Sequence, residues 1–264
     1  MDNHSQTGMS FLNKNVKQAE KQMMLPFWKE EHRAMPNHIA RSALFTPIKK
    51  GARTFHNKEI ISSRCDVEIT YTGLRLDEAD ADLWMQLLHH FRNTSPGNKF
   101  FINRARLLTE LGKSRGKESY KWLEDSMNRL HGSISIKSKR YKISSTLLQI
   151  YATDEETNDY YFKIDKAIVL LFSNKEFSLI QWNKRKKLKY ALSKTLQRHI
   201  ATSSSIEQSY FYSDLKERFK RSGETKYLKR DLKKACEELL AHHIIFKYEL
   251  RKDKLKIWRT RITS

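Results

Sequence analysis

The residues best suited to chemistry lie in a helix-patterned segment near the C-terminus, residues 224–241. Apolar side chains recur there at helical spacing, which predicts a buried stripe of Leu228, Leu232, Cys236 and Leu239. A second face of the same helix would carry Thr225, Lys226, Lys229, Arg230 and Lys233. Such a cationic row binds polyanions, because lysines attract phosphates and the planar fork of Arg230 can pair with both acceptors of a guanine.

A basic hairpin is predicted immediately after this helix. Its strands cover residues 244–248 and 255–258, and its cations are Lys247, Arg251, Lys252 and Lys254. The major groove of DNA admits one α-helix, and the flanking phosphates attract cations on a neighbouring projection. A lysine-rich helix face can also be merely solvated. The adjoining hairpin favours binding to double-stranded DNA.

Positive charge is concentrated in the same part of the chain. The net charge of the 264 residues is +21, and residues 175–264 hold 24 Lys and Arg against 10 Asp and Glu, a balance of +14. A further run before a helix predicted near residues 188–201 consists of Lys184, Arg185, Lys186 and Lys187. We expect this run to clamp the DNA backbone, with a purely solubilising role as the alternative.

Membrane, disulfide and metal classes find little support. The longest wholly apolar run, residues 167–172, is too short to span a bilayer, and residues 1–10 lack a secretory pattern, so a cytoplasmic protein is expected. Cys65 and Cys236 lie too far apart in sequence to indicate a disulfide framework or a zinc site. No cofactor is expected.

Three segments are predicted along the chain: a flexible polar arm (1–24), an irregular leader with a first folded unit (25–173), and a second unit (174–264). Within the first unit, Asp77 can cap a helix that runs to about Arg92. Further helices are predicted near 103–111 and 117–131, and strands near 67–71, 133–137, 143–151 and 160–164.

An internal repeat relates the two units. Leu107, Leu111, Leu123, Met127 and Leu130 are spaced by 4, 12, 4 and 3 residues, and Leu215, Phe219, Leu232, Cys236 and Leu239 by 4, 13, 4 and 3. The one-residue difference falls in a turn, where insertions are tolerated. The expected fold is therefore α+β, with two winged-helix units in tandem.

The first unit is less suited to reading DNA. Its second helix mixes Lys117 and Lys121 with Glu118, Glu124 and Asp125. The positions that could still touch phosphates are Lys113 and Arg115 in the turn, and Lys137, Lys139, Arg140 and Lys142 in a hairpin. We expect this unit to contact flanking backbone and to support self-association.

Enzymatic chemistry is disfavoured at each candidate motif. The Gly112-Lys113-Ser114 sequence lacks the glycine that a phosphate-binding loop needs at position 107. Four acids, Asp77, Glu78, Asp80 and Asp82, suit the positive end of a helix better than a magnesium site. The pairs His89-His90 and His242-His243 diverge in direction. For Tyr210, Phe211 and Tyr212, and for Trp122, Trp182 and Trp258, core packing is favoured over stacking on unpaired bases.

Several short motifs resemble a known family. They are Leu25-Pro26-Phe27-Trp28, Pro36-Asn37, Ala40-Arg41-Ser42-Ala43-Leu44-Phe45, Ile69-Thr70-Tyr71-Thr72-Gly73, Leu111-Gly112, Val169-Leu170-Leu171-Phe172, Trp182 and Ala235-Cys236-Glu237-Glu238-Leu239. Together they resemble the TrfA family of plasmid replication initiators, from about Leu25 nearly to the C-terminus.

The resemblance implies a tandem winged-helix protein that binds repeated origin sites, called iterons, and opens adjacent AT-rich DNA. It also implies recruitment of the host initiator, the replicative helicase and the sliding clamp, control of plasmid copy number, and an equilibrium between active monomers and inactive dimers. No catalytic residue is implied. Two alternatives stay open: a winged-helix transcriptional regulator and a nicking rolling-circle replication enzyme.

Overall fold

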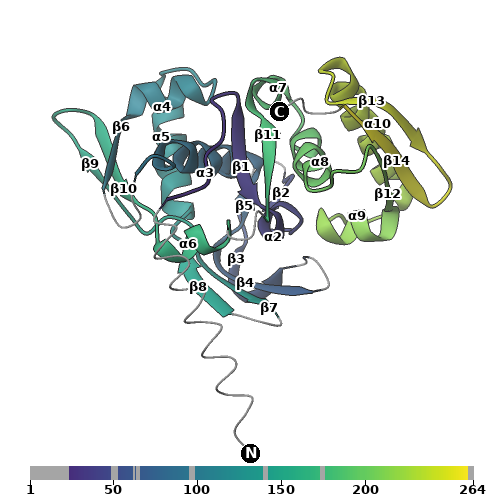
Figure 1. The fold of residues 1–264 in the computed structure, drawn as a ribbon, viewed down its shortest axis with the longest axis horizontal. Helices are drawn as coiled ribbons and strands as arrows, with labels where there is room; N and C mark the ends of the chain where they lie inside the picture. Colours follow the sequence, from purple (N-terminus) through teal and green to yellow (C-terminus); the bar gives the residue numbers. More distant parts are fainter. Residues whose placement is uncertain are drawn as a thin grey trace, which may run out of the picture.

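The computed structural model describes residues 24–48, 53–61, 63, 66–94, 99–138, 142–172 and 176–260. Outside these ranges lie the predicted arm up to residue 23 and the predicted boundary at residues 173–174. Three single residues named above also lie outside them: Cys65, Lys139 and Arg140. The fold mixes helices with small, mainly antiparallel sheets (Figure 1).

The first part of the chain contains most of the sheet structure. In order, its elements are β1 (His32–Pro36), α2 (Asn37–Ala40), β2 (Phe45–Thr46), β3 (Phe55–Ile61), β4 (Val67–Leu74), β5 (Leu76–Asp77), α3 (Glu78–Phe91), β6 (Phe100–Asn103), α4 (Arg104–Glu110), α5 (Lys117–Arg129), β7 (Ser133–Ser138), β8 (Lys142–Thr146), β9 (Ile150–Asp154), β10 (Asp159–Lys163), α6 (Lys166–Leu170) and β11 (Phe177–Gln181). The second part continues with α7 (Trp182–Lys187), α8 (Ala191–Ala201), β12 (Glu207–Phe211), α9 (Tyr212–Arg218), α10 (Thr225–Ala241), β13 (Ile245–Leu250) and β14 (Lys254–Arg259).

Helix α3 begins where the sequence predicts. The Asp77 carboxylate accepts hydrogen bonds from the backbone N–H groups of Ala79 and Asp80, and the Asp80 carboxylate accepts one from the N–H of Asp77. This reciprocal cap satisfies donors that the first turn of a helix leaves unpaired. The predicted cap and the helix up to Phe91 are thus confirmed.

Helix α10 also forms as predicted, and for the predicted reason. The apolar stripe is buried, with Leu228 4% exposed and Leu232, Cys236 and Leu239 0% exposed. It packs in one cluster with side chains of α8 and α9 and with Leu255 and Ile257 of β14. Burial of that stripe leaves the polar faces of α10 toward solvent.

Most strands belong to three main sheets. Their strand orders are β12-β14-β13, β6-β10-β9 and β3-β4-β7-β8, and every pairing in them is antiparallel. The single strand predicted over residues 143–151 is wrong, since β8 and β9 belong to different sheets. Leu147 and Leu148 between them are both 0% exposed, so the chain bends here to bury two leucines.

The leader is more regular than its prolines suggest. Residues 32–36 form β1, which pairs antiparallel with β11 from His32 opposite Gln181 to Pro36 opposite Phe177. Trp28 is 2% exposed and donates a hydrogen bond from Nε1 to His89 Nδ1, so it anchors the leader on α3. The expected irregular leader is therefore corrected to a paired strand preceded by a buried anchor.

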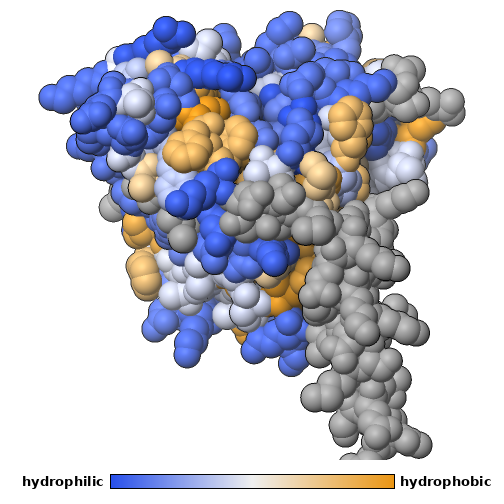
Figure 2. All heavy atoms as spheres, turned by 60° about the vertical axis from the view of Figure 1, so that its left-hand side comes forward, coloured by the Kyte–Doolittle hydropathy of each residue, from blue (hydrophilic) through white to orange (hydrophobic). Residues whose placement is uncertain are grey.

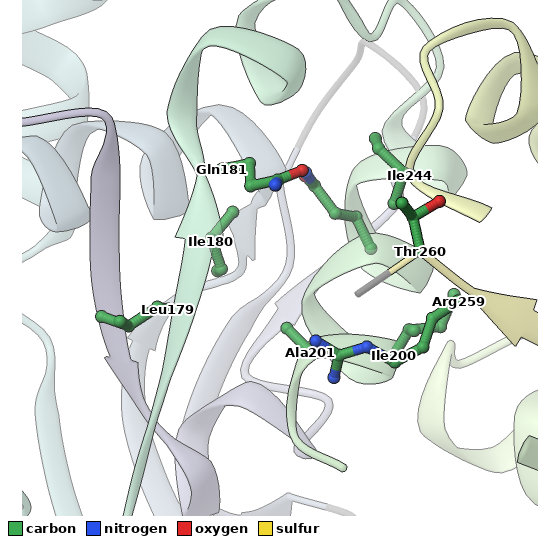
Figure 3. Close-up of a pocket in the computed structure, with 9 residues that line it drawn as sticks. Leu179, Ile180, Gln181, Ile200, Ala201, Ile244, Arg259 and Thr260 are labelled. Carbon is green, nitrogen blue, oxygen red and sulfur yellow. The ribbon is translucent and has the colours of Figure 1, made fainter. Parts of the chain in front are cut away.

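The buried apolar side chains form two clusters, one between Leu25 and Trp182 and the other between Leu188 and Ile257. Helix α8 contributes to the second cluster and packs on β11 of the first part. Figure 3 shows a small cavity at this seam, with Ile180 on β11 and Ile200 on α8 among its walls. The two parts of the chain are therefore in direct contact.

A buried ionic network crosses the same seam. Arg185 Nη2 lies 2.7 Å from Glu78 Oε2, and Arg198 Nη2 lies 2.7 Å from Glu78 Oε1. All three residues are at most 2% exposed. Asp82 pairs with Arg185 and with Lys194. Burial opposes ionisation of Glu78, but Arg198 and Arg185 outweigh it and hold the pKa of its carboxyl below the ordinary value.

This network corrects the expected role of the acids in α3. They do more than face the positive end of a helix, because Glu78 and Asp82 pair with cations of α7 and α8. Asp80 pairs with Arg53 and Arg129. In the described ranges, no three His, Cys, Asp or Glu side chains are grouped so that they could hold a metal ion. No helix described here has the length and apolar content needed to cross a membrane.

Candidate nucleic-acid interface

One face of α10 presents cations to solvent. The side chains of Lys226, Arg230 and Lys233 are 64%, 63% and 61% exposed, and Thr225 is half-buried at the start of the helix. Leu228 and Leu232 face the core from the opposite side. The structure therefore brings together four of the five positions that the sequence proposed for this helix, on a surface that a polyanion can reach.

Arg230 is held by two neighbours. Its guanidinium carbon lies 5.6 Å from the ring centroid of Tyr227, and Nη2 lies 3.2 Å from the Asp231 carboxylate. Lys226 Nζ lies 5.1 Å from the same ring. Tyr227 is 49% exposed and was not among the predicted site residues. An aromatic residue three positions before an exposed arginine in a helix could have indicated this contact.

The basic hairpin, β13–β14 with its turn at residues 251–253, carries charges of both signs. Lys247 and Arg251 each lie 2.8 Å from Glu249, and hydrogen bonds from these two residues lower the pKa of Glu249 to about 2. Lys247 also lies over the Trp258 ring, 4.5 Å from its centroid. Among the residues that the structure describes, no carboxylate pairs with Lys252 or Lys254, whereas Lys247, Arg251 and Lys256 of the same hairpin each have one.

Lys229 does not project from α10 as its helical position predicts. It is half-buried, its Nζ donates a hydrogen bond of 2.9 Å to the carbonyl oxygen of Lys252, and it lies 4.8 Å from the ring centroid of Tyr212. The side chain therefore connects α10 to the turn of the basic hairpin.

The cationic run of α7 divides in its roles. Arg185 is 0% exposed and is paired with Glu78 and Asp82, so its expected contact with the DNA backbone is wrong. Lys184 donates a hydrogen bond of 2.8 Å to the carbonyl oxygen of His243, just after α10. Lys186 and Lys187 are exposed and remain candidates for phosphate contact.

The turn between α4 and α5 lies beside α7. A β-carbon placed on Gly112 would lie 3.9 Å from Cδ of Lys186. In that turn, Lys113 Nζ lies 3.8 Å from the ring centroid of Trp122, and Arg115 is exposed and donates to Thr109 Oγ1. The turn that carries Lys113 and Arg115 thus lies beside Lys186 of α7, while Lys137 and Lys142 lie on the separate β7–β8 hairpin.

The aromatic residues near the interface differ in burial. Tyr212 and Trp182 are buried at 3%, whereas Tyr210, Trp122 and Trp258 are half-buried. Phe211 is 50% exposed, and Lys254 Nζ lies 5.8 Å from its ring centroid. Core packing, expected for all of them, is confirmed for Tyr212 and Trp182 and is wrong for Phe211.

Comparison with known proteins shows the family of the chain. A family model described as TrfA protein matches residues 2–256. The plasmid replication initiator protein TrfA of Escherichia coli is 32% identical over 220 residues, which cover 78% of this chain and 56% of that protein. The chain thus matches a little over half the length of this relative.

Two solved structures share the fold. A crystal structure of domains 2 and 3 of RctB matches with a TM-score of 0.59 at 12% identity, covering 87% of this chain and 99% of that one. The Pi initiator protein in complex with iteron DNA matches with a TM-score of 0.56 at 13% identity, covering 89% of this chain and all of that one. With the family match over nearly its whole length, this chain belongs to the TrfA family of plasmid replication initiators.

Proposed function

We propose that this chain initiates plasmid replication by binding repeated double-stranded sites at an origin. Helix α10 enters the major groove, and the basic hairpin contacts neighbouring phosphates. The observation that carries the proposal is the contact between Lys229 of α10 and the hairpin turn, which holds the turn and its exposed Lys252 against the helix. Family membership and the fold shared with the Pi initiator, whose structure contains iteron DNA, support it.

Each half of the chain is proposed to be a winged helix. The second runs α8, β12, α9, α10, β13, β14 with strand order β12-β14-β13. The first runs α3, β6, α4, α5, β9, β10 with strand order β6-β10-β9. This order leaves out the inserted hairpin β7–β8, whose strand β7 pairs with β4 in another sheet. This shared order supports an internal repeat. The two core clusters favour a division within α7 over one near residue 173.

The first unit is proposed to support binding rather than to read bases. Its β9–β10 hairpin, in the place of the wing, carries the acids Asp154, Glu155, Glu156 and Asp159, which phosphates repel. Lys113 and Arg115, with Lys186 and Lys187 beside them, are proposed to contact flanking backbone. Figure 2 shows the side of the molecule on which this hairpin lies as mainly hydrophilic, with small apolar patches, and Phe101 of β6 is 62% exposed. Such patches support self-association through this unit.

Binding of several copies side by side is proposed to bend the origin and to offset the unpairing of adjacent AT-rich steps. The chain acts in the bacterial cytoplasm by binding, without covalent chemistry, and recruits the host initiator, the replicative helicase and the sliding clamp.

Footprinting on the DNA that flanks the gene tests the proposal. We expect protection of several directly repeated segments, with permanganate-reactive thymines in an adjacent AT-rich stretch. With roughly 6–10 phosphates contacted, affinity should fall by about 10³–10⁵ between about 50 and 200 mM salt. Protection of one isolated operator without nearby opening would indicate a transcriptional regulator. Tyrosine-dependent cleavage of supercoiled DNA would indicate a nicking enzyme.

A further inference from the structure

The turn of the basic hairpin is held from outside the hairpin at three consecutive carbonyl groups. The Tyr212 hydroxyl donates to the carbonyl oxygen of Arg251 at 3.1 Å, and Lys229 Nζ donates to that of Lys252 at 2.9 Å. The backbone N–H of Tyr212 donates to the carbonyl oxygen of Asp253 at 3.1 Å. Hairpin tips are commonly solvated and mobile. This tip is instead attached to the start of α9 and to the second turn of α10.

Lys229 has the position and the environment of a connecting residue. Its ammonium group lies between the Lys252 carbonyl and the Tyr212 ring, 4.8 Å from the ring centroid. Tyr212 is 3% exposed, so this ring cannot move aside without disturbing the core. Two exposed lysines of the same helix, Lys226 and Lys233, instead form ion pairs with Glu224 and Glu237 of their own segment.

Two physical effects follow from this arrangement. Carbonyl oxygens carry partial negative charge, so binding all three to donors reduces the repulsion that a phosphate would meet at the tip. A fixed turn also loses little conformational freedom when DNA binds, which favours affinity.

We propose that Lys229 and Tyr212 are positioning residues, which fix the basic hairpin relative to α10 so that the hairpin cations reach phosphates while Arg230 reads a base. Lys229 acts through the hairpin and not by its own contact with DNA. This inference rests on the proposed DNA-binding function of the second unit.

A mutant cycle on the full chain separates positioning from direct contact. The probe is a duplex that the wild-type chain selects from a random-sequence pool, with affinity measured by fluorescence anisotropy. Lys229→Met keeps the aliphatic stem and removes the ammonium group, and Lys252→Ala removes an exposed hairpin cation without its carbonyl. We expect Lys229→Met to weaken binding about tenfold and Lys252→Ala to have little further effect in the Lys229→Met background, because coupled residues are non-additive.

Lys233→Met is the matched control, one turn further along the same helix. Its effect should multiply with that of Lys252→Ala, and it should reduce the dependence of log affinity on log salt by about one contact. Lys229→Met should reduce that dependence by more than one contact, because the hairpin cations are displaced with it. The inference would be overturned if the affinity losses of Lys229→Met and Lys252→Ala multiply and Lys229→Met reduces the salt dependence by only one contact. Lys229 would then be a direct phosphate ligand.

Hydrogen exchange of the free protein tests the anchor without DNA. Amide exchange across residues 251–254 should accelerate in Lys229→Met, and less so in Tyr212→Phe, which loses only the bond to the Arg251 carbonyl. Unchanged exchange in both variants would overturn the positioning role, whatever the protein binds. If the wild-type chain selects no duplex, the proposed DNA binding is wrong, and the anchor has no DNA-directed role. Faster exchange in Lys229→Met would in that case still show that Lys229 anchors the turn.

Discussion

At the scale of single residues, Arg230 differs from the lysines around it in its planar, forked head group, which can pair with both acceptors of a guanine. The Tyr227 ring and the Asp231 carboxylate both contact its guanidinium group. A guanidinium group that is held before binding loses less rotamer freedom when it pairs with a base than a free lysine does. Arg230 is therefore the residue of α10 best prepared for base reading.

Arg230→Ala should flatten the preference among base variants of the selected duplex more than it weakens binding to random DNA. A bidentate arginine–guanine pair contributes about 1–3 kcal/mol of discrimination, and that difference should disappear at one base position. The measurement is competition binding against each single-base variant, with Lys226→Ala as the control that weakens all sequences alike. An equal loss on every sequence would reduce Arg230 to a phosphate contact.

At the scale of elements, predictions succeeded where the signal was local. The apolar period of α10 and the cap at Asp77 are each contained within a few turns of chain, and both helices formed where expected. The strand β1 had no such signal, because its partner β11 lies far along the sequence and Pro36 suggested irregular chain. Likewise, the run of basic residues in α7 correctly predicted exposed cations at Lys186 and Lys187. It could not predict that Arg185 pairs with Glu78, because that contact depends on the tertiary structure.

The candidate interface was predictable to the same extent. Periodicity identified the exposed cations of α10, since burial of Leu228 and Leu232 determines which face points outward. The position of Lys229 depends on the turn of a hairpin that packs against the helix, and periodicity contains no information about that contact.

Helix α8 contains a histidine that should make folding sensitive to acid. Burial, and next the charges of Arg218 and Arg41, lower the pKa of His199 to about 3. The unfolded chain binds this proton near pH 6.5, so the stabilisation by neutral His199 is complete above that pH and declines as pH falls toward 3. The free energy of unfolding should fall by up to about 1.4 kcal/mol per pH unit in this range from this residue.

Urea unfolding at a series of pH values checks this expectation. His199→Gln should have a shallower decline than the wild type, because the variant has no imidazole to protonate at this position. The same pH dependence in His199→Gln and the wild type would contradict a neutral buried His199.

At the scale of the whole molecule, the two core clusters are joined by charged groups as well as by apolar contact. Glu78 of α3 binds Arg185 of α7 and Arg198 of α8, and Arg198 also donates to the carbonyl oxygens of Ala40 and Phe45. Removing one member of a buried ion pair leaves the other uncompensated, which is costly. We therefore expect cooperative unfolding of the two clusters to depend on this network.

Glu78→Gln should lower the free energy of unfolding by about 3–5 kcal/mol and separate the unfolding of the two clusters. Four of the five tryptophans, Trp28, Trp84, Trp122 and Trp182, belong to or pack on the first cluster, and Trp258 lies on β14, so tryptophan fluorescence is weighted toward the first cluster. This fluorescence and far-ultraviolet circular dichroism should give one urea transition in the wild type and different midpoints in the variant. Glu118→Gln, on the exposed face of α5, should change stability by no more than about 0.5 kcal/mol. Coincident transitions in Glu78→Gln would show that apolar packing alone couples the clusters.

The buried ionic network also limits how the sequence of this chain can change in evolution. Glu78, Asp82, Arg185 and Arg198 each have two or more partners in the network. Reversing the charge of any one of them would therefore bury two like charges against each other. Selection would remove such a variant before a second substitution could restore the charge balance. Descendants of this chain should exchange these four positions as a set or keep them all, however freely the rest of the surface drifts.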